Sequence, residues 1–304
     1  MKNPEVSVVM PAYNHEKFVG EAIESVLNQT FTDFEFVIIN DGSKDGTEAV
    51  IRRYDDPRIK YYSQKNQGAH NAINKGISIA KGKYISIINS DDVYHPERLS
   101  FLLEQAESRD AVFIFTDLIF LSESHGYKEN HSEWFENLKS IYNNSKSLEV
   151  TFLSGNIAVT TSNFFFLSSI LKEIEPFQPY RYVHDYDFVL RVLLKYPDKF
   201  LYVSDKKYLS YRLHGANTIR ESITAVHIEV LRLLLEKTHE FIQNESDRIR
   251  AKAALKYIKH MDEDIFRTMQ QNNSYTQDIL NTISWRLTEP LRRLGDFLLR
   301  IKSK

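Results

Sequence analysis

Short apolar runs recur through the first 115 residues of this 304-residue chain, and they restrict its fold more than any other feature. Each run is nearly continuous rather than alternating with polar residues, which is typical of strands buried on both faces of a parallel sheet. The runs are Val6–Met10, Phe34–Ile39, Ile59–Tyr62, Tyr84–Ile88 and Ala111–Phe115. A sheet of this kind needs helices on both of its faces.

Between these runs, apolar residues recur at the spacing of one face of a helix. Val19, Ile23 and Val26 are four and three residues apart, so they share one face of a helix. A similar apolar face extends from Ala69 to Ala80. This alternation of strand and helix predicts right-handed βαβ units, and therefore an α/β fold with a mostly parallel central sheet.

The remainder of the chain has a different pattern. Residues 116–150 are polar and weakly patterned, which predicts a long surface excursion, and residues 151–213 mix apolar strands with a helix. Residues 216–289 contain neither glycine nor proline and are rich in leucine, which predicts long helices. We therefore predict an α/β domain over residues 1–220 and a C-terminal helical region over residues 221–304.

Composition and charge exclude several classes of function. The 39 basic and 41 acidic residues give a formal charge of -2, which argues against a broad nucleic-acid-binding surface. The absence of cysteine excludes disulfides, thiolate zinc sites and cysteine nucleophiles. No run approaches the roughly 20 apolar residues of a membrane span, and the first apolar run is too short for a secretory signal. We therefore expect a cytoplasmic protein.

Polar and acidic side chains follow three of the predicted strands. They lie in the segments Pro11–Asn14, Asn40–Thr47 and Asn89–Asp92. Ligands of open parallel sheets bind beyond the carboxyl ends of the strands, where these segments are expected. The glycine-rich phosphate loops GxGxxG and GxxxxGK(S/T) are both absent. A nucleotide bound here needs a metal to neutralise its diphosphate, and aspartate oxygens are ligands that Mg²⁺ or Mn²⁺ prefers.

These segments carry a family resemblance. The run VSVVMPAYNHEKFVGEAIESVLNQTFTDFEFVIINDGSKDGT, followed by NQGAHNAINKGISIAKGKYISIINSDD, resembles the N-terminal half of family-2 glycosyltransferases of the GT-A fold. The resemblance continues through His184-Asp185 and Tyr211-Arg212-Leu213-His214, so it covers about 215 residues. It implies an inverting enzyme that transfers a sugar from a UDP-sugar or dTDP-sugar to a hydroxyl of a glycan or lipid-linked acceptor, in the synthesis of a bacterial-type surface polysaccharide or glycolipid.

The same resemblance implies which residues bind the nucleotide sugar. They are Pro11, Ala12, Tyr13, Asn14, Asp41, Gln67, Gly68, Asn89 and Ser90. Asp41 would accept a hydrogen bond from a pyrimidine ring N–H, or it belongs to an Asx turn before Gly42. Asn14 has the alternative role of an N-cap for the following helix.

A divalent cation, Mn²⁺ or Mg²⁺, is also implied. Asp91 matches the last acidic position of the family's DxD metal motif, and His214 matches a C-terminal histidine that approaches the metal or the diphosphate. The chain departs from the motif at Asn89, which removes one negative charge. Asp92 is expected to be a turn residue or a cap of the next helix. Arg212 is expected to contact phosphate or to pair with an acidic neighbour.

Transfer to a hydroxyl also needs a base. The segment that begins with His184 and Asp185 resembles the family's acidic region at the start of a helix, which implies that Asp185 is the base and that His184 lies at the edge of the acceptor cleft. A helix N-terminus would keep this carboxylate ionised. The alternative is that Asp185 is an ordinary carboxylate in the first turn of a helix.

The C-terminus carries an apolar stripe with heptad-like spacing. It consists of Leu287, Leu291, Leu294, Leu298 and Ile301. Six basic residues oppose two acidic ones over residues 282–304. Packing on the catalytic domain or on a second copy of the chain explains the stripe, and we rank these two explanations together above contact with an anionic membrane surface.

Two other functional classes compete with the enzyme. A non-catalytic protein that binds a sugar nucleotide or a glycan is favoured by Asn89. A nucleotidyltransferase shares the α/β sheet and the metal carboxylates, but it requires a glycine-rich and basic phosphate loop after the first strand. The segment PAYN is not such a loop.

Overall fold

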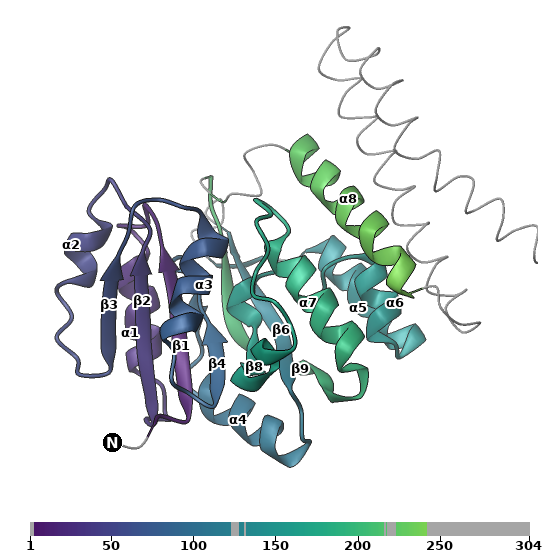
Figure 1. The fold of residues 1–304 in the computed structure, drawn as a ribbon, viewed down its shortest axis with the longest axis horizontal. Coiled ribbons are helices and arrows are strands. Elements are labelled where there is room, and N and C mark those ends of the chain that lie inside the picture. Colours follow the sequence, from purple (N-terminus) through teal and green to yellow (C-terminus); the bar gives the residue numbers. More distant parts are fainter. Residues whose placement is uncertain (1–2, 123–127, 131, 216, 218–222, 242–304) are drawn as a thin grey trace, which may run out of the picture. The chain divides into compact units, whose positions relative to one another are not determined.

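The computed structural model describes residues 3–122, 128–130, 132–215, 217 and 223–241 (Figure 1). Contacts divide the chain into two compact units. The first contains Met1–Glu133 and Ala158–Asn217, and the second contains Trp134–Ile157 and Thr218–Lys304. The site developed below belongs to the first unit.

The first unit is built on one sheet, which has nine strands in the described part of the chain. The strands are β1 (Val6–Ala12), β2 (Phe34–Asn40), β3 (Ile59–Ser63), β4 (Tyr84–Ile87), β5 (Val93–Tyr94), β6 (Phe113–Ser122), β7 (Lys128–Asn130), β8 (Phe165–Leu167) and β9 (Phe200–Leu213). Their order is β3-β2-β1-β4-β8-β6-β9-β5, and β7 pairs with β6. The pairs among β1 to β4 and the pair of β6 with β9 are parallel. The predicted α/β fold with a mostly parallel sheet is therefore confirmed.

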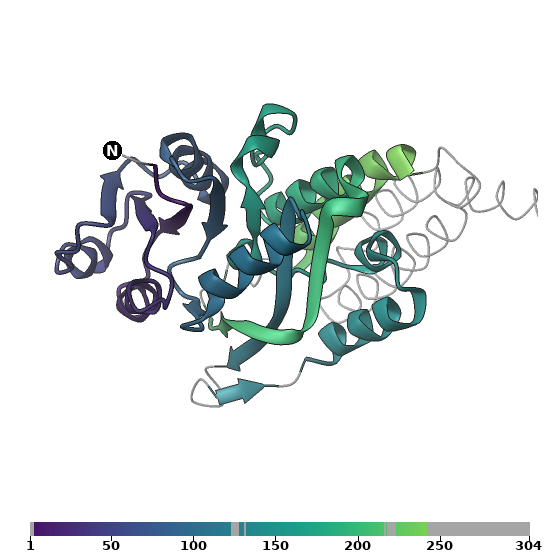
Figure 2. The ribbon, with the colours of Figure 1, turned by 90° about the horizontal axis from the view of Figure 1, so that it is seen from below.

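The first four strands form as the apolar runs predict. Every residue of β1 and β2 is buried. Helix α1 (Val19–Leu27) covers one face of these strands and α3 (Ala69–Ile79) covers the other (Figure 2). The contact of α3 with β1 depends on Gly76, because a Cβ at this position would lie 2.3 Å from Cγ1 of Val9.

The path of the chain through these strands fixes where a ligand can bind. It runs outward from β1 to β2 and β3, and then returns to β4 on the other side of β1. Right-handed crossovers in the two directions place the connecting helices on opposite faces of the sheet. The carboxyl ends of β1 and β4 are therefore a topological switch point, which is where open α/β sheets bind ligands.

The remaining helices complete the two units. They are α2 (Thr47–Ile51), α4 (Arg98–Ser108), α5 (Glu133–Ser145), α6 (Leu148–Ser154), α7 (His184–Lys195) and α8 (Ile223–Phe241), with 3-10 turns at Thr161–Asn163, Ser168–Lys172 and Pro197–Lys199. Helix α8 agrees with the helix predicted from about residue 221. The apolar stripe of residues 287–301 lies outside the described residues. None of the described helices combines the length and the apolar character that crossing a membrane requires.

The prediction of a long surface excursion over residues 116–150 is wrong. Strand β6 continues to Ser122, and α5 and α6 follow. Helix α5 buries Phe135 and Leu138, and Phe152 of α6 is also buried. A few buried apolar residues separated by exposed asparagine, serine and lysine give too weak a period for the helices to be predicted from sequence.

The buried carboxylate of Glu35 links three strands, through a hydrogen bond from Ser7 in β1 and an ion pair with the partly exposed Lys60 in β3. Glu35 in β2 accepts hydrogen bonds from Oγ of Ser7 at 2.6 Å and from the backbone N–H of Lys81 at 2.5 Å, and it pairs with Lys60. Burial alone would raise the pKa of Glu35. The hydrogen bonds from Lys60 and Ser7 outweigh it and hold this pKa below its ordinary value of 4.5.

We expect Glu35→Gln to lower the free energy of unfolding by about 1.5–3 kcal/mol at pH 7, the range for hydrogen bonds to a charged group. A lowered folded-state pKa stabilises the fold above the unfolded value near 4.5, and this contribution is lost as the pH falls through the folded value. Urea unfolding of wild type and Glu35→Gln at pH 7 and at pH values below 4.5 measures how the difference in unfolding free energy depends on pH. Glu48→Gln, which removes an exposed ion pair with Arg52, should change little. A difference between wild type and Glu35→Gln that is the same at every pH would contradict this account.

Candidate metal and nucleotide site

Two loops meet at the switch point between β1 and β4. His15 follows the end of β1, and the turn Ser90–Asp91 follows β4. Because β1 and β4 are adjacent parallel strands, with Val9 paired to Ile87, both loops leave the sheet at the same edge.

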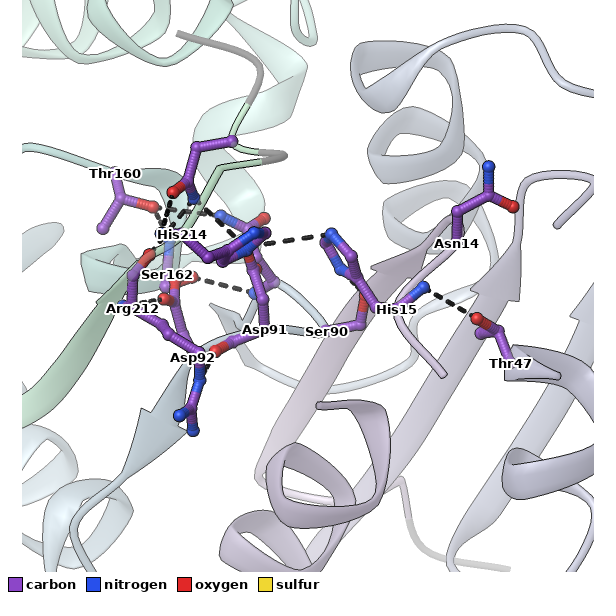
Figure 3. A network of polar contacts seen from close by, with 12 residues as sticks. Asn14, His15, Thr47, Ser90, Asp91, Asp92, Thr160, Ser162, Arg212 and His214 are labelled. Atoms are coloured by element: carbon purple, nitrogen blue, oxygen red, sulfur yellow. Dashed lines mark hydrogen bonds and ion pairs between the residues drawn. The ribbon is translucent and has the colours of Figure 1, made fainter. Parts of the chain in front are cut away.

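Strand β9 contributes the third part of the site. Strand β5 comes directly after the Asp91 turn and pairs antiparallel with β9, with Val93 opposite Ser210. This register brings the residues at the end of β9 alongside the turn. His214 therefore lies next to Asp91, although 123 positions separate them (Figure 3).

The three side chains that converge here are a possible cation-binding set. Nε2 of His214 is 3.0 Å from Oδ2 of Asp91, and Nε2 of His15 is 3.9 Å from the same oxygen. The ligand atoms of all three residues lie within 4.8 Å of one another. Asp91 and His214 are only 6% and 4% exposed. The arrangement brings together the two residues, Asp91 and His214, that were predicted as metal ligands, and it adds His15.

The surroundings shift the pKa values of the neighbouring carboxyl groups of Asp91 and Asp92 in opposite directions. Burial favours the neutral acid at Asp91, but the hydrogen bond from His214 and the charges of His15 and His214 outweigh it and lower the pKa of this group. Burial raises the pKa of Asp92 well above its ordinary value, and the charge of Asp91 raises it further. The favoured site for negative charge is therefore Asp91, which faces both imidazoles.

Asp92 holds the framework of the site together. Its Oδ1 accepts a hydrogen bond from the backbone N–H of Arg212 at 2.9 Å, and its Oδ2 accepts one from Oγ of Ser162 at 2.5 Å. Asp92 does not cap α4, whose N-cap is Glu97. The prediction of a structural role for Asp92 is therefore right, but its partners lie far along the chain instead of in the next helix.

Arg212 pairs with an acidic neighbour, as one of its two predicted roles required. One of its terminal nitrogens is 2.5 Å from Oε2 of Glu21, and its Nε donates to the backbone carbonyl of Asp91 at 2.8 Å. Its guanidinium lies 5.1 Å from the ring centre of Phe18. Arg212 thus fastens the Asp91 turn to α1.

Asn89 occupies the first position of the DxD-like motif, and its amide is used inside the protein. Its Nδ2 donates to Oγ1 of Thr160 at 3.0 Å, and its Oδ1 accepts from Oγ1 of Thr161 at 3.0 Å. Its backbone N–H donates to Oγ of Ser162 at 2.8 Å. These contacts give Asn89 a structural role in joining two loops.

Asp41, Gln67 and Gly68, all predicted to bind nucleotide, lie together. Oδ1 of Asp41 accepts hydrogen bonds from Nε2 of Gln64 at 2.7 Å and from the backbone N–H of Gln67 at 3.0 Å. Its Oδ2 accepts one from the backbone N–H of Gly68 at 2.9 Å, where φ is +90°. Asp41 therefore anchors the start of α3. A carboxylate has about four lone-pair sites, so one remains for a ligand.

The residues after β1 have mixed roles. Pro11 and Ala12 are buried in the last two positions of β1, whereas the ring of Tyr13 is 39% exposed. Asn14 has a positive φ of 53°, and its Oδ1 accepts from the backbone N–H of Lys44 at 2.8 Å. The suggestion that Asn14 caps the next helix is wrong, because α1 has Phe18 as its N-cap.

The predicted base lies in the first turn of α7. Oδ1 of Asp185 accepts a hydrogen bond from the backbone N–H of Tyr186 at 2.7 Å. Burial and the charge of His70 together lower the pKa of the preceding His184 to about 4. His70, in the first turn of α3, also interacts electrostatically with Asp41. The first turns of α3 and α7 are thus close enough to interact near Asp41.

Sequence reasoning missed His15 as a member of the site. The available signal was its place directly after PAYN, at the end of the strand next to the one that precedes Asp91. Ser90, which is predicted to bind nucleotide, contacts His15, with its Oγ 2.8 Å from Nδ1 of the imidazole.

Comparison with known proteins agrees with the resemblance seen in the sequence. A model of glycosyl transferase family 2 matches residues 7–165. An uncharacterized glycosyltransferase of Rickettsia typhi is 29% identical over 73% of this chain and 68% of its own length. One from Methanocaldococcus jannaschii is 34% identical over 64% of this chain and 66% of its own length. Other relatives are matched over 15% to 41% of their length.

Solved structures confirm the predicted GT-A fold. TarS of S. aureus is 18% identical and has a TM-score of 0.62, with 84% of this chain and 70% of that chain covered. Glucosyl-3-phosphoglycerate synthase from Mycobacterium tuberculosis is 17% identical and has a TM-score of 0.57, with 77% of this chain and 80% of that chain covered. At these identities the likeness establishes the shared fold alone.

Proposed function

Because the chain belongs to glycosyl transferase family 2, we propose that it transfers a sugar from a UDP-sugar or dTDP-sugar to a hydroxyl of a glycan or lipid-linked acceptor, with inversion at the anomeric carbon. The observation that carries this proposal is the convergence of Asp91, His214 and His15 at the switch point of the sheet. A role in cell-surface polysaccharide synthesis is part of the same proposal.

Complexes of the structural neighbours support a nucleotide-sugar donor. TarS has been solved with UDP and with UDP-GlcNAc. The mycobacterial synthase was solved with Mn²⁺ and UDP, and a mannosyltransferase from Pyrobaculum calidifontis with GDP-Man and Mn²⁺. We assign a pyrimidine nucleotide to this chain because Asp41 retains an acceptor site for a ring N–H, and the exposed ring of Tyr13 is available to the base.

The site fits a divalent cation by its chemistry. An ionised carboxylate and imidazole nitrogens are ligands for Mn²⁺ and related ions, and Asp91 and His214 supply both from buried positions. When bound, such a cation neutralises negative charge on a leaving diphosphate. Asn217 keeps His214 in place, because its Oδ1 accepts a hydrogen bond from the backbone N–H of His214 at 2.6 Å.

Asp185 is assigned as the base of an in-line displacement. The bond between the acceptor oxygen and the anomeric carbon forms as the bond from that carbon to the diphosphate oxygen breaks. The proton of the acceptor hydroxyl passes to the carboxylate of Asp185, and the nucleoside diphosphate leaves. The N-terminus of α7 favours the ionised carboxylate that this step requires.

The competing proposal is a non-catalytic protein that binds a sugar nucleotide or a glycan. Asn89 favours it, since this residue removes one acidic group from the motif. The cluster of Asp91 with two histidines argues against a protein that binds only a glycan, because a glycan without phosphate has no need of a cation site. Turnover of a sugar nucleotide separates the enzyme from a non-catalytic protein that binds the same ligand.

Ligand screening tests the proposed donor class. We expect UDP or dTDP, with Mn²⁺, to raise the melting temperature of the full chain more than GDP does, because a ligand that binds only the folded state stabilises it. Thermal-shift measurements with each nucleotide, in Mn²⁺ and in EDTA, give the comparison. A larger shift with GDP would overturn the pyrimidine assignment, and no shift with any nucleotide would overturn the donor proposal.

A further inference from the structure

His15 lies beside the predicted metal ligands at the end of β1, with its ring facing that of His214 (Figure 3). We propose that His15 is a third protein ligand of the cation, which two imidazoles and one carboxylate then hold. This inference rests on the proposed function for the presence of a cation at Asp91. It adds the ligand that replaces the missing acidic group at position 89.

The geometry allows all three side chains to bind one ion. The ligand atoms of His15, Asp91 and His214 lie within 4.8 Å of one another. Two ligands that are each about 2.1 Å from one ion are at most about 4.2 Å apart. A side-chain movement of a few tenths of an ångström therefore closes the set around an ion. The rings of His15 and His214 form an edge-to-face pair, with an interplanar angle of 87° and centroids 5.6 Å apart, so both imidazoles border the carboxylate of Asp91.

Ser90 orients the imidazole of His15 for this role. Its Oγ is 2.8 Å from Nδ1 of His15. When Nδ1 carries the proton and donates to Ser90, Nε2 keeps its lone pair on the side of Asp91. Nε2 then lies 3.9 Å from Oδ2 of Asp91, so the imidazole lone pair and the carboxylate oxygen can bind the same cation. Metal-binding histidines commonly donate their second N–H to a neighbouring acceptor, which fixes the tautomer in this way.

The backbone of His15 is also held in place. Its N–H donates to Oγ1 of Thr47 at 2.7 Å. The amide of Asn89 is instead oriented toward a neighbouring loop, since both of its ends are hydrogen bonded to Thr160 and Thr161. His15 is thus the neighbouring side chain that is placed to complete the set.

The ligand set has a consequence for metal choice. Imidazole nitrogens suit transition ions such as Fe²⁺, Ni²⁺ and Zn²⁺, whereas Mg²⁺, Ca²⁺ and Mn²⁺ favour oxygen ligands. A site with two imidazoles and one carboxylate should therefore bind Zn²⁺ or Fe²⁺ more tightly than Mg²⁺, and loss of His15 should reduce this preference.

Binding of Mn²⁺ to the full chain, without nucleotide, tests the inference. The signal of free Mn²⁺ in electron paramagnetic resonance gives the affinity, and Mg²⁺ competition gives the selectivity. We expect His15→Ala to weaken Mn²⁺ binding tenfold or more. Ser90→Ala, which keeps the ring but removes its partner, should weaken it about tenfold, the lower end of the range for such partners. The exposed His95 provides a matched control, and His95→Ala should bind Mn²⁺ as the wild type does.

Pulsed resonance of bound Mn²⁺ gives a second readout that does not depend on activity. Nitrogen couplings from two imidazoles are expected in the wild type and from one in His15→Ala. Unchanged affinity and two nitrogen couplings in His15→Ala would overturn the role of His15. Wild-type Mn²⁺ affinity in Asp91→Asn would overturn the cation site of the proposed function as well, so the two failures are distinguishable. Thermal unfolding of each variant identifies any loss of folding.

Discussion

We expect replacement of Asp185 by asparagine to lower the kcat of glycosyl transfer by about 10²–10⁴, the usual contribution of a positioned base. The amide cannot take the proton of the acceptor hydroxyl at neutral pH. It keeps the size of the carboxylate, and its oxygen can still accept the hydrogen bond from the backbone N–H of Tyr186. The start of α7 and the affinity for nucleotide should therefore be preserved.

Initial rates of nucleoside diphosphate release, with donor and acceptor both present, measure this effect. Asp198→Asn removes an exposed carboxylate just after α7 and should keep the wild-type rate. If Asp185→Asn binds nucleotide normally and also turns over at the wild-type rate, Asp185 is an ordinary carboxylate of a first helical turn. The transfer mechanism would then need another base.

Replacing Asp91 by asparagine should remove the dependence of UDP binding on Mn²⁺. The wild-type carboxylate is buried, and its pKa is lowered by His214 and His15, so it is the negative charge that a cation meets in this site. Loss of this charge should weaken UDP binding in Mn²⁺ by about 10–100-fold, at least as much as the loss of an outer-shell partner of a metal ligand.

Calorimetric titration of UDP in Mn²⁺ and in EDTA separates the metal-dependent part of UDP binding from the metal-independent part. In EDTA the wild type and Asp91→Asn should bind UDP equally, because no cation then links Asp91 to the diphosphate. Equal affinities in Mn²⁺ would remove Asp91 from the metal site.

The central strands could be predicted from sequence because the apolar residues that make each strand buried lie within that strand. The residues of β1 and β2 are apolar on both faces, and α1 and α3 show their periods over several turns. Once these elements are assigned, the handedness of βαβ units places PAYN and the Asp91 turn at one edge of the sheet.

The details of the site depend on contacts between distant parts of the chain. Asn89 meets Thr160 across 71 positions, and His214 reaches Asp91 only because β9 pairs with β5. Sequence spacing contains no information about either contact. The family resemblance supplied His214, but it did not reveal that the amide of Asn89 is occupied.

His15 is an intermediate case. Its position after β1 was visible in the sequence, and the adjacency of β1 and β4 follows from the predicted topology. What the sequence did not give is the direction of the imidazole, which depends on Ser90 and Thr47. A residue type with many ordinary structural roles becomes a candidate ligand only when its partners are known.

The central claim is that a cation at the switch point binds the diphosphate of the nucleotide sugar. The most direct test is a crystal structure of the protein with Mn²⁺ and UDP, in which anomalous scattering locates the manganese. We expect an anomalous peak about 2.1 Å from the ligand atoms of Asp91 and His214, with oxygens of the diphosphate in the same coordination shell and Asp185 on the side of the β-phosphate to which the sugar of the donor is attached. A diphosphate bound away from Asp91, or manganese coordinated elsewhere with this pair left out, would contradict the account.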